Sequence, residues 1–227
     1  MLYALAHPAS LLVLLTSFVV GMTLHGWVQA LVAYRLGDRR VGHEGRLRPD
    51  PRRHLDPFGA VAVAISGLGW ARPVELPDRR RRGAVLAVAL SGPLVNVVLG
   101  LACLLGWRFA FGPGSLPREF SYLLQHGITL DNHVASLSLL LVGAQQLYLG
   151  VLSLVPLPPL DGGRLLFALA PRTHGWQRAE HQLVERNIGI AVVLALLLLP
   201  LGSAGLPLLL QVLDSVLVPV LRLLVGG

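Results

Sequence analysis

Long apolar segments separated by arginine-rich stretches restrict the fold of this chain more than any other feature. Residues 8–34 and 83–112 each exceed the about 20 residues that a helix needs to cross a bilayer. Further apolar segments follow at 135–155, 188–201 and 205–225. Hydrophobic residues make up 54% of the chain, charged residues 14%, and the mean hydropathy is +0.65, which does not suit a water-soluble globule. We therefore expect an all-α polytopic membrane protein.

The apolar stretch 58–70 is not expected to span the membrane like the longer apolar segments, because it has only 13 residues. A helix of that length does not cross a bilayer, and basic stretches on both sides predict a re-entrant hairpin. The polar residues 38–57 contain prolines and glycines and predict short β-strands and turns in a cytoplasmic loop. The total is about five to six membrane segments in a single integral membrane domain, 1–227. Its core is 1–170, and 171–227 add an amphipathic stretch and apolar helices.

The positive charge of the chain is clustered and is carried by arginine alone. Seven of the 19 arginines lie between Arg35 and Arg53, and five lie between Arg72 and Arg82. These arginines flank apolar segments, and no aromatic residues alternate with them in a way that would stack on bases. The pattern therefore predicts contact with a lipid bilayer and no binding of nucleic acid.

The arginine clusters also predict the topology, because positively charged loops tend to remain on the cytoplasmic side of a membrane. We expect the loops at 35–56, 71–83 and 171–187 to be cytoplasmic. Residues 113–134 contain one arginine and are expected on the opposite face. The chain is thus predicted to be a multi-pass protein of the cell membrane with its N-terminus outside.

A few polar residues interrupt the apolar segments, where an Asp, Lys or Arg costs about 2.5–3.5 kcal/mol at the centre of a membrane helix. His25 and Gln29 are one helical turn apart and so share a helix face. They could form a metal site or only bond to each other or to Gln145. Asp161 lies in "PLPPLDGG", where prolines break the helix, and it could bind a cation or cap the next helix. Asn96 is a further polar residue of this kind.

Five segments of the chain match, in order, the motifs of a known family. They are "VAYRLGD", "GRLRPDPRRHLDPFG", "GWARPVELP", "RRGAVLAVALSGPLVNVVL" and "LVPLPPLDGGRLL". With them, residues 21–225 resemble the site-2 proteases, intramembrane zinc metalloproteases, in their compact bacterial form without a PDZ domain. The resemblance implies that 1–170 form a protease-like core. Such enzymes carry H-E-x-x-H on a helix: the two histidines bind zinc and the glutamate activates the metal-bound water.

By this resemblance His25 and Asp161 are ligands of the metal, which is zinc in the family. Gly26 stands where the family has the glutamate, Gln29 where it has the second histidine, and Ser153 where it has an asparagine. Glycine cannot accept a proton, and a general base typically contributes about 10²- to 10⁴-fold to the rate. An amide oxygen binds zinc poorly, so Gln29 is at best a weak third ligand. The pattern therefore implies no catalytic residue and argues against retention of zinc.

Three further polar residues are expected beside this site or in its cleft, namely Asn96, His54 and Gln145. Asn96 belongs to "GPLVNV", one of the matching motifs. His54 lies in "RRHLDPFG" together with Asp56, and we expect this motif to form the entry of the hairpin and not to replace the lost ligand. His43 and Glu44 are expected in a solvated loop.

Three functions are compatible with this pattern. The first is a pseudoprotease that keeps the fold and binds a transmembrane helix or another membrane protein without cleaving it. The second is an active zinc endopeptidase that cleaves peptide bonds in or near the membrane with an unusual ligand or base. The third, a pathway for a small molecule or ion, lacks the rings of charge and the internal repeats that such pathways use.

Overall fold

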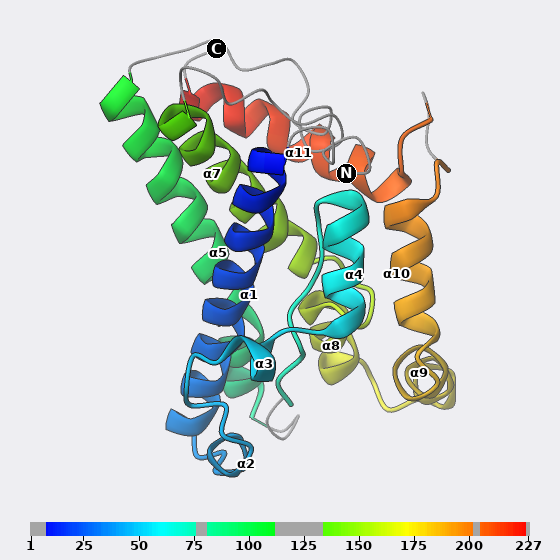
Figure 1. Cartoon of the computed structure of the whole chain (residues 1–227). Helices are drawn as coiled ribbons and strands as arrows, with labels where there is room; N and C mark the ends of the chain where they lie inside the picture. The colour runs from blue at the N-terminus through cyan, green and yellow to red at the C-terminus, as the bar shows by residue number, and fades with distance from the viewer. Residues whose placement is uncertain (1–7, 76–80, 112–133, 202–204, 226–227) are drawn as a thin grey trace.

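The computed structural model describes residues 8–75, 81–111, 134–201 and 205–225 and folds them into helices joined by loops (Figure 1). The elements are α1 (Pro8–Arg35), α2 (Arg40–His43), α3 (Pro51–His54), α4 (Pro57–Ser66), α5 (Arg82–Phe111), α7 (Val134–Ser153), α8 (Asp161–Leu169), α9 (His174–Glu180), the π-helical turn η2 (His181–Glu185), α10 (Ile188–Leu198) and α11 (Leu208–Val225). The predicted helical class is confirmed.

The loop that follows α1 differs from the prediction of short strands. In the described part of the chain no strand forms, and an isolated bridge pairs Leu55 with Ala71. The loop instead contains the single-turn helices α2 and α3. Asp50 explains the second one, because its side chain accepts a hydrogen bond from the backbone N–H of Arg52 and Pro51 occupies the first helical turn.

Helices α1, α5 and α7 pack against one another and form the central bundle (Figure 1). Glycines let two of these helices approach closely: a Cβ on Gly100 of α5 would lie 2.8 Å from the carbonyl oxygen of Gly143 in α7. Small residues at such contacts are typical of helix pairs in membranes, where van der Waals packing drives association. The fully buried core of the bundle includes Leu14, Phe18, Met22, Leu104, Leu141, Tyr148 and Leu152.

The predicted hairpin at 58–70 is a helix followed by an extended return. Asp56 caps α4 by accepting hydrogen bonds from the backbone N–H groups of Phe58 and Gly59. Gly67 ends the helix in the left-handed region with a φ of 85°. The returning segment lies directly on the helix, because a Cβ on Gly69 would be 2.1 Å from the carbonyl oxygen of Gly59. The chain reversal is confirmed, and its position in the membrane stays a prediction.

Two helices, Ser10–Arg35 and Arg82–Phe111, are long and apolar enough to cross a membrane. The pair His174–Glu185 and Ile188–Leu198 adds a third candidate if it is one span broken by a bend of 69°. The chain is therefore a helical membrane protein, while the total of five to six membrane segments stays a prediction. Residues 113–134, expected on the outer face, lie outside the described part, apart from Val134, which begins α7.

One face of α5 carries an exposed apolar stripe that suits contact with lipid. Its members recur at helical spacing and are each more than a third exposed, namely Leu86, Leu90, Leu94, Val98, Leu105 and Phe109. Exposed apolar area of this extent is unfavourable in water and is expected where acyl chains surround a helix.

Candidate functional site

His25 and Asp161 meet in the interior of the bundle, although 136 positions separate them in the sequence. The Nε2 atom of His25 donates to Oδ2 of Asp161 across 2.8 Å. His25 comes from the middle of α1, and Asp161 is the first residue of α8. The exposed fraction of the residue is 1% for His25 and 8% for Asp161. The two groups that carry the resemblance to a metal site therefore share one buried location.

Asn96 and Gln29 extend the hydrogen-bond network around this pair, while Nδ2 of Asn96 is buried without a partner. Nδ1 of His25 lies 3.2 Å from Oδ1 of Asn96, a residue of α5. The Nε2 amide nitrogen of Gln29 donates to Oδ1 of Asp161 across 2.9 Å. Both ring nitrogens of His25 and both carboxylate oxygens of Asp161 thus have partners within the protein. The network links α1, α5 and α8, and a buried charged group is stable only with such partners.

The proline-rich turn before α8 explains how Asp161 reaches this network. The N-cap position of α8 is Leu160, which has no side chain able to cap, so the alternative in which Asp161 caps the helix is wrong. The turn folds tightly on itself, and a Cβ on Gly162 would lie 2.1 Å from the carbonyl oxygen of Leu154. Glycine is therefore required beside the aspartate, as its place in "PLPPLDGG" suggested.

Gly92 forms the wall of the site on the side of α5. A Cβ at this position would lie 2.4 Å from Nε2 of His25 and 2.8 Å from Nε2 of Gln29. Any larger residue would displace the two polar side chains from Asp161. Sequence reasoning did not identify Gly92 as a site residue; the signal available to it was the motif "SGPLVNV", in which Gly92 precedes Asn96 by one helical turn.

His54 lies against Gly26, which by the resemblance above corresponds to the glutamate of the family. A Cβ on Gly26 would be 2.8 Å from Nδ1 of His54 and 3.2 Å from its Cβ. Nε2 of His54 donates to the carbonyl oxygen of Arg48, which can only accept, while Nδ1 is buried without a partner. Burial lowers the pKa of His54, so the ring is neutral and Nδ1 carries a lone pair. His54 also holds the hairpin, because its carbonyl oxygen accepts from the N–H of Arg72.

The amides of α7 and Ser153 make contacts elsewhere in the bundle. Nε2 of Gln145 donates to the carbonyl oxygen of Gly67 and so fixes the end of α4. Nε2 of Gln146 donates to the carbonyl oxygen and to the hydroxyl of Ser17 in α1. The hydroxyl of Ser153 donates to the carbonyl oxygen of Leu149, within its own helix.

The donor set at this site does not fit a catalytic zinc ion. Such an ion takes three protein ligands from imidazole, thiolate or carboxylate groups and keeps a fourth position for water. Here His25 and Asp161 are the groups of that kind, and they bond to each other and to amides. Over the described ranges, no group of three His, Cys, Asp or Glu side chains is placed to hold a metal ion.

Comparisons with known proteins relate the chain to metalloproteases. A family model described as Peptidase family M50 matches residues 13–199. YwhC of Bacillus subtilis is 34% identical over 205 residues, which cover 88% of this chain and 86% of YwhC. Rip2 of Mycobacterium tuberculosis is 30% identical over 169 residues, which cover 70% of this chain and 57% of Rip2. Both are named as putative zinc metalloproteases.

A more distant relative is the zinc metalloprotease MJ0392 of Methanocaldococcus jannaschii. It is 28% identical over 137 residues, which are 60% of this chain and 34% of that protein. No solved structure matches the chain.

Proposed function

The chain belongs to peptidase family M50, the family of the site-2 proteases, and from this premise we propose that it is a pseudoprotease. It keeps the membrane fold and the meeting of His25 with Asp161. It lacks the proton acceptor and one of the metal ligands, because Gly26 and Gln29 occupy those positions. Its proposed role is to bind a transmembrane helix of another membrane protein without cleaving it.

The observation that carries this proposal is the buried hydrogen-bond network that joins His25, Gln29 and Asp161. Asp161 accepts from His25 and Gln29, and the second nitrogen of His25 faces Asn96. A metal ion would have to break these bonds, and it would gain only one imidazole and one carboxylate in return. The neighbouring imidazole of His54 also fills the side of α1 from which a glutamate at position 26 would extend. Both features support a structural role for residues that are metal ligands in the family.

The first experiment measures zinc and proteolysis in the full chain purified in detergent. We expect zinc far below one ion per chain by elemental analysis and no cleavage of a single-pass membrane substrate. The contrary result would be one zinc per chain with cleavage that is abolished by Asp161→Ala. Glu75→Gln is the control, because Glu75 is an exposed carboxylate that pairs with Arg40 and not with a residue of the His25 network.

The second experiment restores the missing groups and takes His54 into account. A glutamate at position 26 would place its Cβ 2.8 Å from Nδ1 of His54, so Gly26→Glu with Gln29→His requires that His54 moves. We expect the triple variant with His54→Ala to bind more zinc than the double variant and to cleave the substrate. Gly26→Gln in the same background is the matched control, because it has the same shape but accepts no proton. Its rate should be lower by about 10²- to 10⁴-fold.

One observation favours the second candidate, an active metalloendopeptidase. Nδ1 of His54 is a buried lone pair without a partner, and it lies beside Gly26. An imidazole in this place could accept a proton where the family uses a carboxylate. If the wild-type chain cleaves a substrate, His54→Gln should abolish cleavage while the chain stays folded. Cleavage that is retained in His54→Gln would exclude His54 as the proton acceptor.

A further inference from the structure

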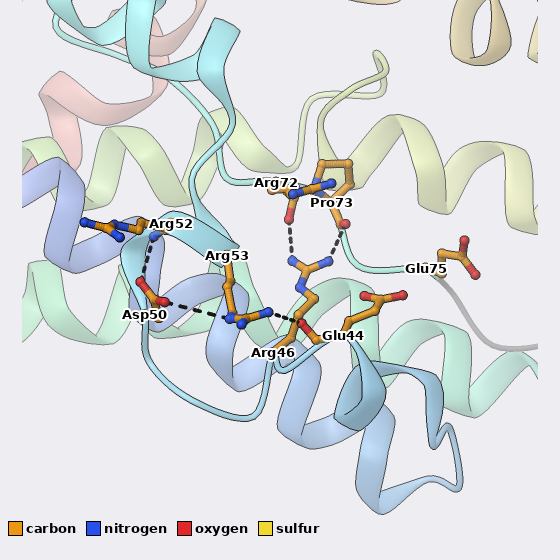
Figure 2. Close-up of a pocket in the computed structure, with 8 residues that line it drawn as sticks. All are labelled: Glu44, Arg46, Asp50, Arg52, Arg53, Arg72, Pro73 and Glu75. Atoms are coloured by element: carbon orange, nitrogen blue, oxygen red, sulfur yellow. Dashed lines mark hydrogen bonds and ion pairs between the residues drawn. The ribbon is translucent and has the colours of Figure 1, made fainter.

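Three arginines lie near the site, and none of their side chains belongs to the hydrogen-bond network of His25 and Asp161. They are Arg46, Arg72 and Arg164. Arg46 holds the loop that returns from α4, since its two Nη atoms donate to the carbonyl oxygens of Arg72 and Pro73, each across 2.8 Å (Figure 2). Burial is the largest cause that lowers the pKa of Arg46 to about 10, and the positive charges of Arg72 and Arg164 contribute to this lowering. The positive charges of Arg72 and Arg164 therefore both lie near that of Arg46.

Arg164 is the least compensated of the three. Its Nη1 atom is buried without a hydrogen-bond partner, and it forms no ion pair with any residue in the described part of the chain. The carboxylates whose charges act on it are Asp161 and Glu75. Asp161 already binds His25 and Gln29, and Glu75 binds Arg40. A guanidinium with a buried nitrogen that has no partner is costly, so an anion from outside the chain would stabilise it.

Arg164 and Arg72 line a common pocket of about 280 Å³. The side chain of Arg72 is exposed and has no partner among the residues that the structure describes. The carboxylate of the pocket, Asp56, is already engaged as the cap of α4. The rest of the lining is mainly apolar and comes from the proline-rich turn, η2 and α10. These apolar residues are Pro158, Pro159, Leu183, Val184 and Ile190, and Pro73 and Asn187 complete the lining.

The pocket lies where a polar helix meets an apolar one. The chain bends by 69° between His174–Glu185 and Ile188–Leu198. Nearly every residue before the bend is exposed and many are polar, whereas α10 is wholly apolar except for its glycine. A change of this kind is expected at the boundary between the headgroups and the hydrocarbon of a bilayer. A pocket with two cations and an apolar wall at this boundary suits an amphiphilic anion.

We propose that the pocket between Arg72 and Arg164 binds the phosphate group of an anionic phospholipid. The phosphate oxygens accept hydrogen bonds from the two guanidinium groups, whose planar arrangement of donors suits phosphate. The glycerol and the first acyl carbons lie against Leu183, Val184 and Ile190. Basic pockets beside membrane helices bind lipid headgroups in this manner. The bound lipid supplies the negative charge that Arg164 lacks within the chain.

The test is native mass spectrometry of the full chain in detergent, titrated with phosphatidylglycerol or with phosphatidylcholine. We expect the wild-type chain to retain phosphatidylglycerol in preference to phosphatidylcholine. Arg164→Gln and Arg72→Gln should each weaken retention of phosphatidylglycerol by about tenfold or more, because each removes a hydrogen bond to a charged group. Should Arg164→Gln fail to fold, Arg72→Gln, in an exposed loop, tests the proposal alone.

Arg52→Gln is the matched control. Arg52 lines the neighbouring pocket of Figure 2 together with Arg72, but it does not line the pocket of Arg164. Its replacement should leave the retention of phosphatidylglycerol unchanged. Equal loss in Arg52→Gln, or no preference between the two lipids, would overturn the proposal. Stabilisation of the wild-type chain against heat by inorganic phosphate, without any preference for phosphatidylglycerol, would overturn the assignment to a lipid.

Discussion

At the scale of single residues, two glycines determine how the polar groups of the site are packed. Gly92 lets α5 approach His25 and Gln29, and Gly26 lets His54 approach α1. By the family resemblance, Gly26 replaces the glutamate that activates the metal-bound water. In the structure it is also a packing position, because the imidazole of His54 occupies the space beside it. The close packing of His54 on α1 therefore depends on the absence of a side chain at position 26.

Gly92→Ala should disrupt the site and destabilise the chain by about 1–3 kcal/mol, the typical cost of overpacking. The reason is that the new Cβ would lie 2.4 Å from Nε2 of His25. Thermal unfolding in detergent measures the effect. Gly83→Ala is the control on the same helix, since a Cβ there meets nothing within 4 Å. An equal effect of the two substitutions would contradict the close contact at Gly92.

His54 should make stability depend on pH. Its unfolded pKa is 6.5 and burial lowers the folded pKa, so below pH 6.5 the unfolded chain binds the proton more readily. Stability is thus full above pH 6.5 and falls as the pH decreases toward the folded pKa. Between about pH 7.5 and about pH 5 the wild type should lose more thermal stability than His54→Gln. The other seven histidines are the same in both proteins, so parallel pH profiles would exclude this effect of His54.

At the scale of elements, short capped helices position the loops that surround the site. Asp50 caps α3 and Asp56 caps α4, and each is followed by a proline in the first helical turn. In the returning segment after α4, the backbone N–H of Arg72 donates to the carbonyl oxygen of His54. The carbonyl oxygen of Arg72 accepts from the guanidinium of Arg46. The placement of His54 beside Gly26 therefore depends on these caps as well as on the bundle.

Asp56→Ala should destabilise the chain by about 1 kcal/mol, because it removes the cap of α4. The carboxylate accepts two backbone hydrogen bonds, from Phe58 and from Gly59, and alanine accepts neither. Asp56→Asn is the matched control, since asparagine caps helices as well as aspartate does. Chemical or thermal unfolding separates the two variants. A loss of stability in Asp56→Asn equal to that in Asp56→Ala would show that charge, and not capping, is important.

At the scale of the whole molecule, a bundle of α1, α5 and α7 carries the site, and the arginine-rich loops lie at one end of it (Figure 1). The site joins α1, α5 and α8, so any displacement of the bundle helices would separate His25 from Asp161. Exposed apolar residues on α5 and α11 suit a lipid environment around this bundle.

The orientation of the molecule can be tested with single cysteines. Cys103→Ser removes the lone thiol and provides the background. Cysteines introduced at Arg52 and at Arg178, both exposed, should react with a membrane-impermeant maleimide in inverted vesicles and not in intact cells. A cysteine at Ser115, in the stretch predicted to be outside, should show the opposite pattern. Labelling of Arg52→Cys from outside intact cells would reverse the predicted topology.

Much of the fold follows from local properties of the sequence. Apolar length identifies α1 and α5, and the short apolar stretch between two basic segments predicts the hairpin. The proline-rich turn predicts a broken helix at Asp161, and the family motifs point to His25 and Asp161 as partners. The predictions of helices and turns succeed because hydrophobicity, helix length and backbone restrictions act over neighbouring residues, whereas the pairing of His25 with Asp161 came from the family resemblance alone.

The remaining features depend on contacts between elements, which spacing along one segment does not report. The loop after α1 has the prolines and glycines of strands and turns, but its caps form short helices. Gln145 has the polarity of a site residue, yet its amide reaches Gly67. Gly92 and His54 acquire their roles only when α5 and α3 pack against α1. The sequence by itself determined a family, a set of apolar helices and a depleted metal motif. Only the tertiary structure decided that His25, Gln29 and Asp161 form hydrogen bonds with one another. These bonds depend on the packing distances between helices that are far apart in the chain.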